Sequence, residues 1–278
     1  MDNDYSNYGE LIKINLSSAP FPHPLRSEGH TYNQKFFPAD KHYSDSSVAV
    51  FIPKGFKPGN KTDFVVYFHG WYNNIDTALS FYKLADQFSS GGKNAILIFP
   101  EGPRNAPDSF GGKLEDEGGF KRFMNDVTSF LVENNKITSK ETGNIILAGH
   151  SGAYHVISFI LNRGEMTENI KEVFLFDALY GQTEKFTHWI THNNGRLINI
   201  YTEDGGTKEE TLNLISDLKG WNIPFISKNE DEITLEDLKN NRLVFIYTKL
   251  THNEVVHINR QFEKFLKASS LAESGHAG

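Results

Sequence analysis

One serine of this chain stands between small residues, in the sequence Gly149-His150-Ser151-Gly152-Ala153. It follows the apolar run 144–148 and precedes a segment with helical spacing, 154–161. A serine at such a strand-to-helix turn is typical of a nucleophile elbow, G-x-S-x-G, whose small residues permit the tight bend. Here Ala153 replaces the last glycine, which adds a single methyl group. We therefore expect Ser151 to act as a nucleophile.

A serine hydroxyl is a weak nucleophile unless a base removes its proton, so other parts of the chain must bring a base to Ser151. The remaining sequence alternates apolar strands with amphipathic helices, which predicts an α/β fold with a mostly parallel sheet and helices on both faces. The predicted strands are 11–16 at an edge, 48–53, 64–68, 95–100, 144–148, 173–176, 196–201 and 243–247. The predicted helices are 77–89, 119–134, 154–161, 184–191, 208–218 and 253–266.

Functional groups of an open parallel sheet collect at the carboxyl ends of its strands. The residues expected at those ends are, in chain order, His69-Gly70-Trp71, Pro100-Glu101-Gly102, Ser151, Asp177, Glu203-Asp204 and His252. A serine, then an acid, then a histidine is the order of an α/β-hydrolase triad.

Over about residues 45 to 268 the sequence resembles the α/β-hydrolase superfamily of serine esterases. The resemblance rests on His69-Gly70, on the elbow at 149–153, and on an acid and a histidine after the last strands. It implies the α/β-hydrolase fold and cleavage of a carboxylic ester through an acyl-enzyme. An amidase or peptidase with the same triad, an acyltransferase and a non-catalytic binding protein of this fold stay open as alternatives.

The resemblance also implies roles for the triad. Ser151 is the expected nucleophile and His252 the expected base, with His257 as a rival. Asp204 is the expected acid, because it follows the strand on which the superfamily most often carries it. Asp177 is the alternative acid and Glu203 a further one.

An oxyanion hole requires two backbone N–H groups aimed at the developing negative charge. The resemblance assigns these donors to Gly152 and Trp71, with His69 fixing the loop that carries Trp71. The residues expected to contact substrate are Tyr72, Arg104, His150 and Tyr180. Arg104 could instead form a salt bridge to Asp108 or Glu115, and His155 is expected to pack.

About 18 residues separate the end of the strand at Asp177 from the strand that begins at Arg196. Many members of the superfamily insert a helical cap at this point, but these residues have room for one helix only. We therefore expect an open cleft without a cap, suited to small, bulky or polymeric esters.

The chain has 278 residues, a formal net charge of −7 and no cysteine. This balance argues against a nucleic-acid partner, and the absence of cysteine excludes disulfides, thiol nucleophiles and thiolate metal sites. We expect no membrane span, no cofactor and no metal, and no His-x-x-x-His pair on a helix. The polar start predicts no signal peptide, although a secreted or periplasmic mature chain is compatible with the sequence; the compartment and the oligomeric state stay open.

The composition predicts one main domain with two flanking segments. Residues 1–45 are expected to form an N-terminal extension packed on or beside the core. Residues 46–268 are expected to form the α/β-hydrolase domain, and residues 269–278 a flexible tail, because they are small and polar.

Overall fold

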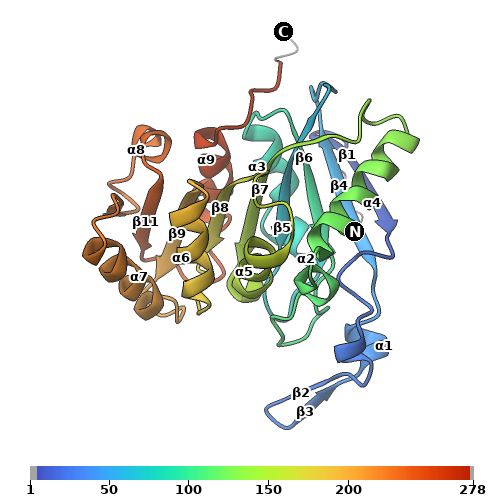
Figure 1. Cartoon of the computed structure of the whole chain (residues 1–278), viewed down its shortest axis with the longest axis horizontal. Helices are drawn as coiled ribbons and strands as arrows, with labels where there is room; N and C mark the ends of the chain where they lie inside the picture. Colours follow the sequence, from blue (N-terminus) through green and yellow to red (C-terminus); the bar gives the residue numbers. More distant parts are fainter. Residues whose placement is uncertain (1–4, 276–278) are drawn as a thin grey trace.

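The computed structural model describes residues 5–275, and its centre is a nine-stranded sheet (Figure 1). From one edge to the other, the strands are β1 (Gly9–Asn15), β4 (Ser47–Pro53), β6 (Ala95–Pro100), β5 (Thr62–Phe68), β7 (Thr142–His150), β8 (Ile170–Phe176), β9 (Arg196–Thr202), β11 (Leu243–Thr248) and β10 (Ile226–Asn229). β1 and β4 run antiparallel to their neighbours, and the other neighbouring pairs are parallel. The predicted α/β class and mostly parallel sheet are confirmed.

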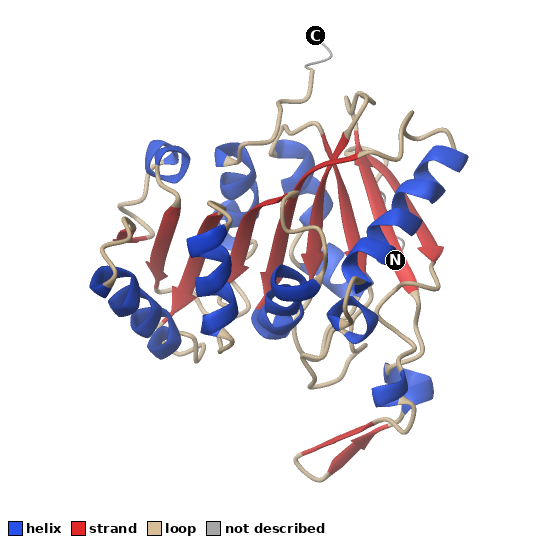
Figure 2. Ribbon diagram, in the orientation of Figure 1, coloured by secondary structure: helices blue, strands red, loops and turns tan. Residues whose placement is uncertain are grey.

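Helices cover both faces of the sheet, as Figure 2 shows. One face carries α4 (Gly119–Glu133), α5 (Tyr154–Arg163), α6 (Thr183–His192) and α7 (Lys208–Gly220). The other face carries α2 (Ile75–Phe81), α3 (Leu84–Ser90), α8 (Leu235–Asn240) and α9 (Gln261–Ala268). Successive strand side chains point to opposite faces, so Phe64 and Val66 of β5 pack in one layer and Val65 and Tyr67 in the other. Central strands such as β5 and β6 are therefore apolar over most of their length, which is why the sequence shows continuous apolar runs there.

Two predicted helices are shorter in the structure. The segment 77–89 forms α2 and α3, which are separated at Lys83 by a left-handed backbone angle (φ 51°). The segment 253–266 is helical only at η4 (Ile258–Arg260) and α9, and Asn259 and Arg260, both with positive φ, interrupt the helix between them. Two elements were not predicted: β10, and α8, which begins with a capping box between Thr234 and Asp237.

The N-terminal extension contributes to the sheet and to its carboxyl end. β1 is the predicted edge strand and pairs with β4. The following residues form η1 (Pro24–Arg26), β2 (His30–Tyr32), β3 (Lys35–Phe37) and α1 (Ala39–His42). The β2–β3 hairpin and α1 project beyond the end at which the parallel strands finish (Figure 1). Phe21, Phe37 and Tyr43 form a small core with Ala106, so this segment supports the loop that follows β6.

The expected flexible tail is wrong for residues 269–274. Leu271 is buried, and the backbone N–H and hydroxyl of Ser270 donate to the buried carboxylate of Glu172. The Ser274 N–H donates to the carbonyl of Gly92. A run of small polar residues is therefore held by a buried carboxylate, which composition does not reveal. The last three residues of the predicted tail, and residues 1–4 of the predicted extension, lie outside the described residues.

The sheet has a topological switch between β5 and β7. The chain leaves β5 to form β6 on one side, and later returns as β7 on the other side. Connections that leave a parallel sheet in opposite directions open a crevice at the carboxyl ends of the strands. Here that crevice lies at Phe68 and His150, directly before His69-Gly70-Trp71 and Ser151. None of the helices within residues 5–275 has the length and apolar character of a membrane-spanning helix.

Candidate active site

Ser151 occupies the sharp turn that its sequence predicts. It begins η3 (Ser151–Ala153) with a left-handed backbone angle (φ 58°), which is uncommon for residues other than glycine and stores strain. A Cβ on Gly149 would lie 2.6 Å from Cβ of Ala153, and a Cβ on Gly70 would lie 2.4 Å from Cβ of Ser151. The turn therefore tolerates Ala153 because Gly149, which packs against it, has no side chain. In the same way, the lack of a side chain at Gly70 lets the loop after β5 approach the serine.

His252 follows β11 and is hydrogen-bonded to Asp177 at the end of β8. Nδ1 of His252 lies 2.6 Å from Oδ2 of Asp177, whose side chain is fully buried. An ionised carboxylate only accepts hydrogen bonds, so Nδ1 carries the proton and Nε2 keeps a free lone pair. This is the tautomer that a general base requires.

Asp177 is held by the loop after β9. It accepts hydrogen bonds from the backbone N–H of Thr202 (3.1 Å), from the Thr202 hydroxyl (2.8 Å) and from the Thr207 hydroxyl. Burial alone would raise the pKa of Asp177, but the hydrogen bonds from His252, Thr207 and Thr202 hold it below its ordinary value. A Cβ on Gly205 would lie 1.8 Å from Oδ2, so this loop needs a glycine where it passes the carboxylate.

This geometry favours the alternative acid over the first choice. Asp204 is exposed and has no hydrogen bond to His252, whereas the alternative, Asp177, has one. Glu203 is exposed as well, and it bonds to Lys208 and Tyr247. The loop at 202–207 supports the carboxylate instead of supplying it. Its two threonines and Gly205, spaced to surround one carboxylate, are the sequence signal that could have indicated this arrangement.

Ser151 and His252 line one cavity of about 760 Å³. Within residues 5–275 no hydrogen bond joins the two side chains, and the Ser151 hydroxyl interacts instead with the hydroxyl of Tyr180. Hydrogen bonds between a nucleophile and its base are often long before substrate binds and shorten in the complex. The rival base His257 does not line this cavity. Its ring packs against Phe81 and Tyr82.

His150, expected to contact substrate, lines the cavity but is buried and fully engaged. Its Nε2 lies 2.8 Å from the backbone carbonyl of His252, and its Nδ1 lies 3.1 Å from the Tyr82 hydroxyl. The rings of His150 and His252 lie 4.5 Å apart. Burial, together with the adjacent His252, lowers the pKa of His150 to about 3. A neutral His150 that donates through Nε2 therefore holds the backbone of His252 in place.

Trp71 and Gly152 belong to the two segments that meet at Ser151: Gly152 follows the serine, and Trp71 follows Gly70, which lies against it. Gly152 lies at the start of η3, where N–H groups have no partner within the helix. A Cβ on Gly152 would lie 2.7 Å from the indole of Trp71, so the two segments are in close contact. The Trp71 indole N–H donates to the Ser109 hydroxyl (2.7 Å). These positions suit an oxyanion hole formed by two backbone donors.

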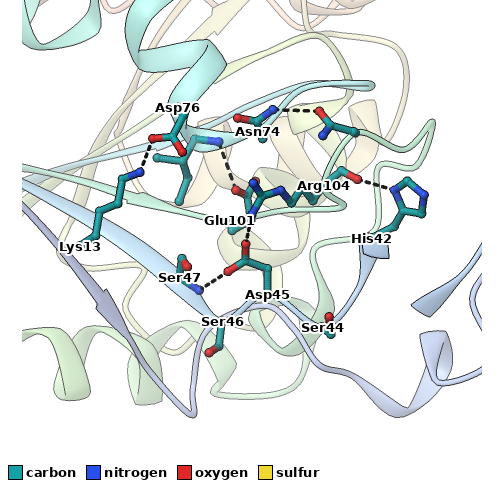
Figure 3. A network of polar contacts seen from close by, with 12 residues as sticks. Lys13, His42, Ser44, Asp45, Ser46, Ser47, Asn74, Asp76, Glu101 and Arg104 are labelled. Atoms are coloured by element: carbon teal, nitrogen blue, oxygen red, sulfur yellow. Dashed lines mark hydrogen bonds and ion pairs between the residues drawn. The ribbon is translucent and has the colours of Figure 1, made fainter. Parts of the chain in front are cut away.

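Three of the four residues expected to contact substrate reach the cavity. Tyr72 and Tyr180 line it, as does His150. Arg104 does not, because its guanidinium forms an ion pair with Asp45 while its backbone carbonyl accepts a hydrogen bond from His42 (2.6 Å), as Figure 3 shows. Its expected alternative partners, Asp108 and Glu115, are bonded to Arg26 and His155 instead.

Aromatic side chains form much of the cavity wall. They are Trp71, Tyr72, Phe81, Tyr82, Tyr154 and Tyr180. The lining contains no aspartate, glutamate, lysine or arginine, so the cavity favours an uncharged group with aromatic or other flat apolar surface. Within the described part of the chain, α6 is the single helix between β8 and β9, and no inserted cap stands between these strands.

The expectation about paired histidines is wrong. His188 and His192 have His-x-x-x-His spacing on α6, and their exposed rings stack with centroids 4.1 Å apart. They lack a third ligand, since residues 5–275 bring no three His, Cys, Asp or Glu side chains together in a way that could hold a metal ion.

The architecture and the elbow define an α/β-hydrolase fold, and comparison with solved structures agrees. The feruloyl esterase module from Clostridium thermocellum, complexed with sinapinate, aligns over 100% of this chain and 95% of its own, with a TM-score of 0.57 and 12% identity. A ferulic acid esterase aligns over 93% and 98%, with a TM-score of 0.56 and 14% identity.

A third solved structure is similar in the same way. It is the substrate-bound fluorophosphonate-binding serine hydrolase F of Staphylococcus aureus, which aligns over 94% of this chain and 99% of its own, with a TM-score of 0.56 and 11% identity. At these identities the likeness shows the fold. No protein-family model and no curated protein sequence matches the chain.

Proposed function

We propose that the protein is a serine hydrolase that cleaves carboxylic esters through an acyl-enzyme, with Ser151, His252 and Asp177 as its triad. The observation that carries this proposal is the hydrogen bond between His252 Nδ1 and the buried carboxylate of Asp177, at a cavity that Ser151 also lines. Such a histidine has its Nε2 lone pair ready to take a proton, and a strained serine turn presents the proton to be taken.

The reaction follows from these positions. Ser151 Oγ attacks the ester carbonyl carbon while its proton passes to Nε2 of His252. The carbonyl oxygen becomes an oxyanion that accepts hydrogen bonds from the N–H groups of Trp71 and Gly152. The intermediate collapses, and the alcohol leaves with the proton from Nε2. Water then attacks the acyl-enzyme by the same route, and the acid is released from Ser151.

The cavity supports a finer proposal about substrate. Its aromatic wall and uncharged lining suit an ester of an aromatic acid, and the absence of an inserted cap suits a bulky alcohol. Two similar structures are a feruloyl esterase module with sinapinate and a ferulic acid esterase. We therefore propose an aromatic acyl group, with the alcohol part of the substrate toward the rim formed by Tyr72 and Phe81, which are 58% and 51% exposed.

The test compares p-nitrophenyl acetate, methyl esters of hydroxycinnamic acids and a matching anilide, with Ser151→Ala as the control. We expect ester turnover by the wild type, a higher kcat/KM for the aromatic acyl esters, and only background turnover by the variant. Faster cleavage of the anilide would favour an amidase. Full turnover by Ser151→Ala would contradict the proposal.

A further inference from the structure

Glu101 is a buried carboxylate beside the site that the triad does not use. It follows β6 directly, and its side chain is 3% exposed, while that of its partner His69 is 1% exposed. Oε1 of Glu101 lies 2.9 Å from Nε2 of His69. Oε2 accepts a hydrogen bond from the backbone N–H of Ile75, the first residue of α2 (3.2 Å) (Figure 3). One carboxylate therefore ties together the two ends of the loop 70–74.

His69 transmits this anchoring to a single peptide group. Its Nδ1 lies 2.7 Å from the carbonyl oxygen of Gly70, so it carries a proton and donates to that oxygen. The peptide bond between Gly70 and Trp71 is trans, so its carbonyl and its N–H point in opposite directions. Fixing the carbonyl of Gly70 toward His69 therefore fixes the direction of the Trp71 N–H.

We propose that Glu101 is a positioning residue that, through His69, holds the Gly70–Trp71 peptide with its N–H toward Ser151. The inference rests on the proposed function, since it explains how one donor of the oxyanion hole is oriented. Gly70 fits this role because a Cβ there would lie 3.0 Å from Ser151 Oγ, which places this peptide directly against the nucleophile. If the peptide turned over, the carbonyl oxygen of Gly70 would take the place of the N–H and repel an oxyanion.

The other contacts of this loop hold groups other than the Gly70 carbonyl. The Trp71 indole N–H donates to the Ser109 hydroxyl (2.7 Å), and the Tyr72 N–H donates to the carbonyl of Ala106 (3.0 Å). Asn74 caps α2. Of these contacts, the pair of Glu101 and His69 is the one that reaches the Gly70 carbonyl.

Two groups meet Nε2 of His69. Oε1 of Glu101 lies 2.9 Å from it, and the N–H of Gly102 donates to it (3.1 Å). Glutamine at 101 can still donate to Nε2 and accept from Ile75, whereas alanine can do neither.

The experiment compares Glu101→Ala with Glu101→Gln and with a control, Glu172→Ala. Glu172 is equally buried and accepts hydrogen bonds from Arg196 and Ser270, but it lies near the amino end of β8. For Glu101→Ala we expect kcat on p-nitrophenyl acetate to fall about 100- to 1000-fold, as when one oxyanion donor is lost, with KM little changed. Binding of a boronic acid, which becomes tetrahedral on Ser151, should weaken in parallel.

The two comparison variants should behave differently from Glu101→Ala. We expect Glu101→Gln to recover most of the lost kcat, and Glu172→Ala to lower the melting temperature without changing kcat per folded molecule. In a crystal structure of Glu101→Ala we expect the Gly70–Trp71 peptide to have turned. An unchanged kcat with an unturned peptide, or an equal fall of kcat in Glu172→Ala, would overturn the proposal.

These readouts separate this inference from the proposed function. If the wild type neither cleaves esters nor reacts with a fluorophosphonate, the proposed function fails. The orientation of the Gly70–Trp71 peptide in crystals of Glu101→Ala then still decides whether Glu101 positions it.

Discussion

Replacing Asp177 by asparagine should remove most of the activity while keeping the shape of the side chain. An amide that donates to Nδ1 of His252 forces the ring into the tautomer with its proton on Nε2, so the lone pair that must accept the serine proton is lost. A change of this kind in a serine triad costs about 10⁴-fold in kcat. This corresponds to about 5 kcal/mol of transition-state stabilisation.

The same substitution should also lower stability, and the two effects must be separated. The carboxylate of Asp177 is fully buried and accepts from the N–H and hydroxyl of Thr202 and from the hydroxyl of Thr207. An amide nitrogen in place of one oxygen faces donors, which costs about 1–3 kcal/mol of unfolding free energy. Asp204→Asn is the matched control, because Asp204 is exposed and does not contact His252.

The assay is hydrolysis of p-nitrophenyl acetate at neutral pH, with folded protein quantified by circular dichroism and thermal melting. Asp177→Asn should stay folded and lose about 10⁴-fold in kcat with a similar KM, whereas Asp204→Asn should resemble the wild type. A larger loss in Asp204→Asn, or equally small losses in both, would refute the assignment of the acid.

Three other substitutions test separate parts of the site. Gly70→Ala should lower kcat by about 100-fold or more, since its Cβ would lie 2.4 Å from Cβ of Ser151 and displace an oxyanion donor; wild-type kcat would contradict the close approach. Arg104→Ala should keep kcat/KM within about twofold, because its partly exposed ion pair with Asp45 contributes little; a large rise in KM would return Arg104 to the substrate site. The pKa of His150 is about 3 in the folded protein, below its ordinary value, so only the unfolded protein protonates this histidine as the pH falls from about 6.5 toward 3. His150 should therefore lower the free energy of unfolding by about 1.4 kcal/mol for each pH unit in this range. His150→Gln should reduce this dependence of the unfolding free energy on pH, measured by denaturant titration; an unchanged dependence would contradict a neutral buried His150.

The fold was predictable because its strands are buried on both faces. Continuous apolar runs such as 64–68 and 95–100 are hard to confuse with surface segments, and the helices between them are amphipathic. The missed elements were short and at the periphery: β10, α8 and the β2–β3 hairpin depend on tertiary contacts more than on local pattern. The break at Asn259 and Arg260 was invisible, because two left-handed residues in succession leave no periodic signal.

The positions of the proposed site residues were predictable where local sequence determines geometry. The turn at Ser151 follows from its small neighbours, and His252 follows from its place after the last long strand. The proposed acid was not predictable in this way, because Asp177 and Asp204 both follow strands. The hydrogen bonds that Thr202 and Thr207 donate to the buried carboxylate of Asp177 distinguish the two. Those hydrogen bonds form because β8 and β9 are neighbours in the sheet.

A crystal structure of the wild-type protein after reaction with a fluorophosphonate would examine the proposed chemistry at the reacting atoms. We expect phosphorus bonded to Oγ of Ser151, its free oxygen between the N–H groups of Trp71 and Gly152, and Nε2 of His252 within hydrogen-bonding distance of the adduct. An unmodified Ser151, or an adduct whose oxygen contacts neither N–H group, would contradict the account.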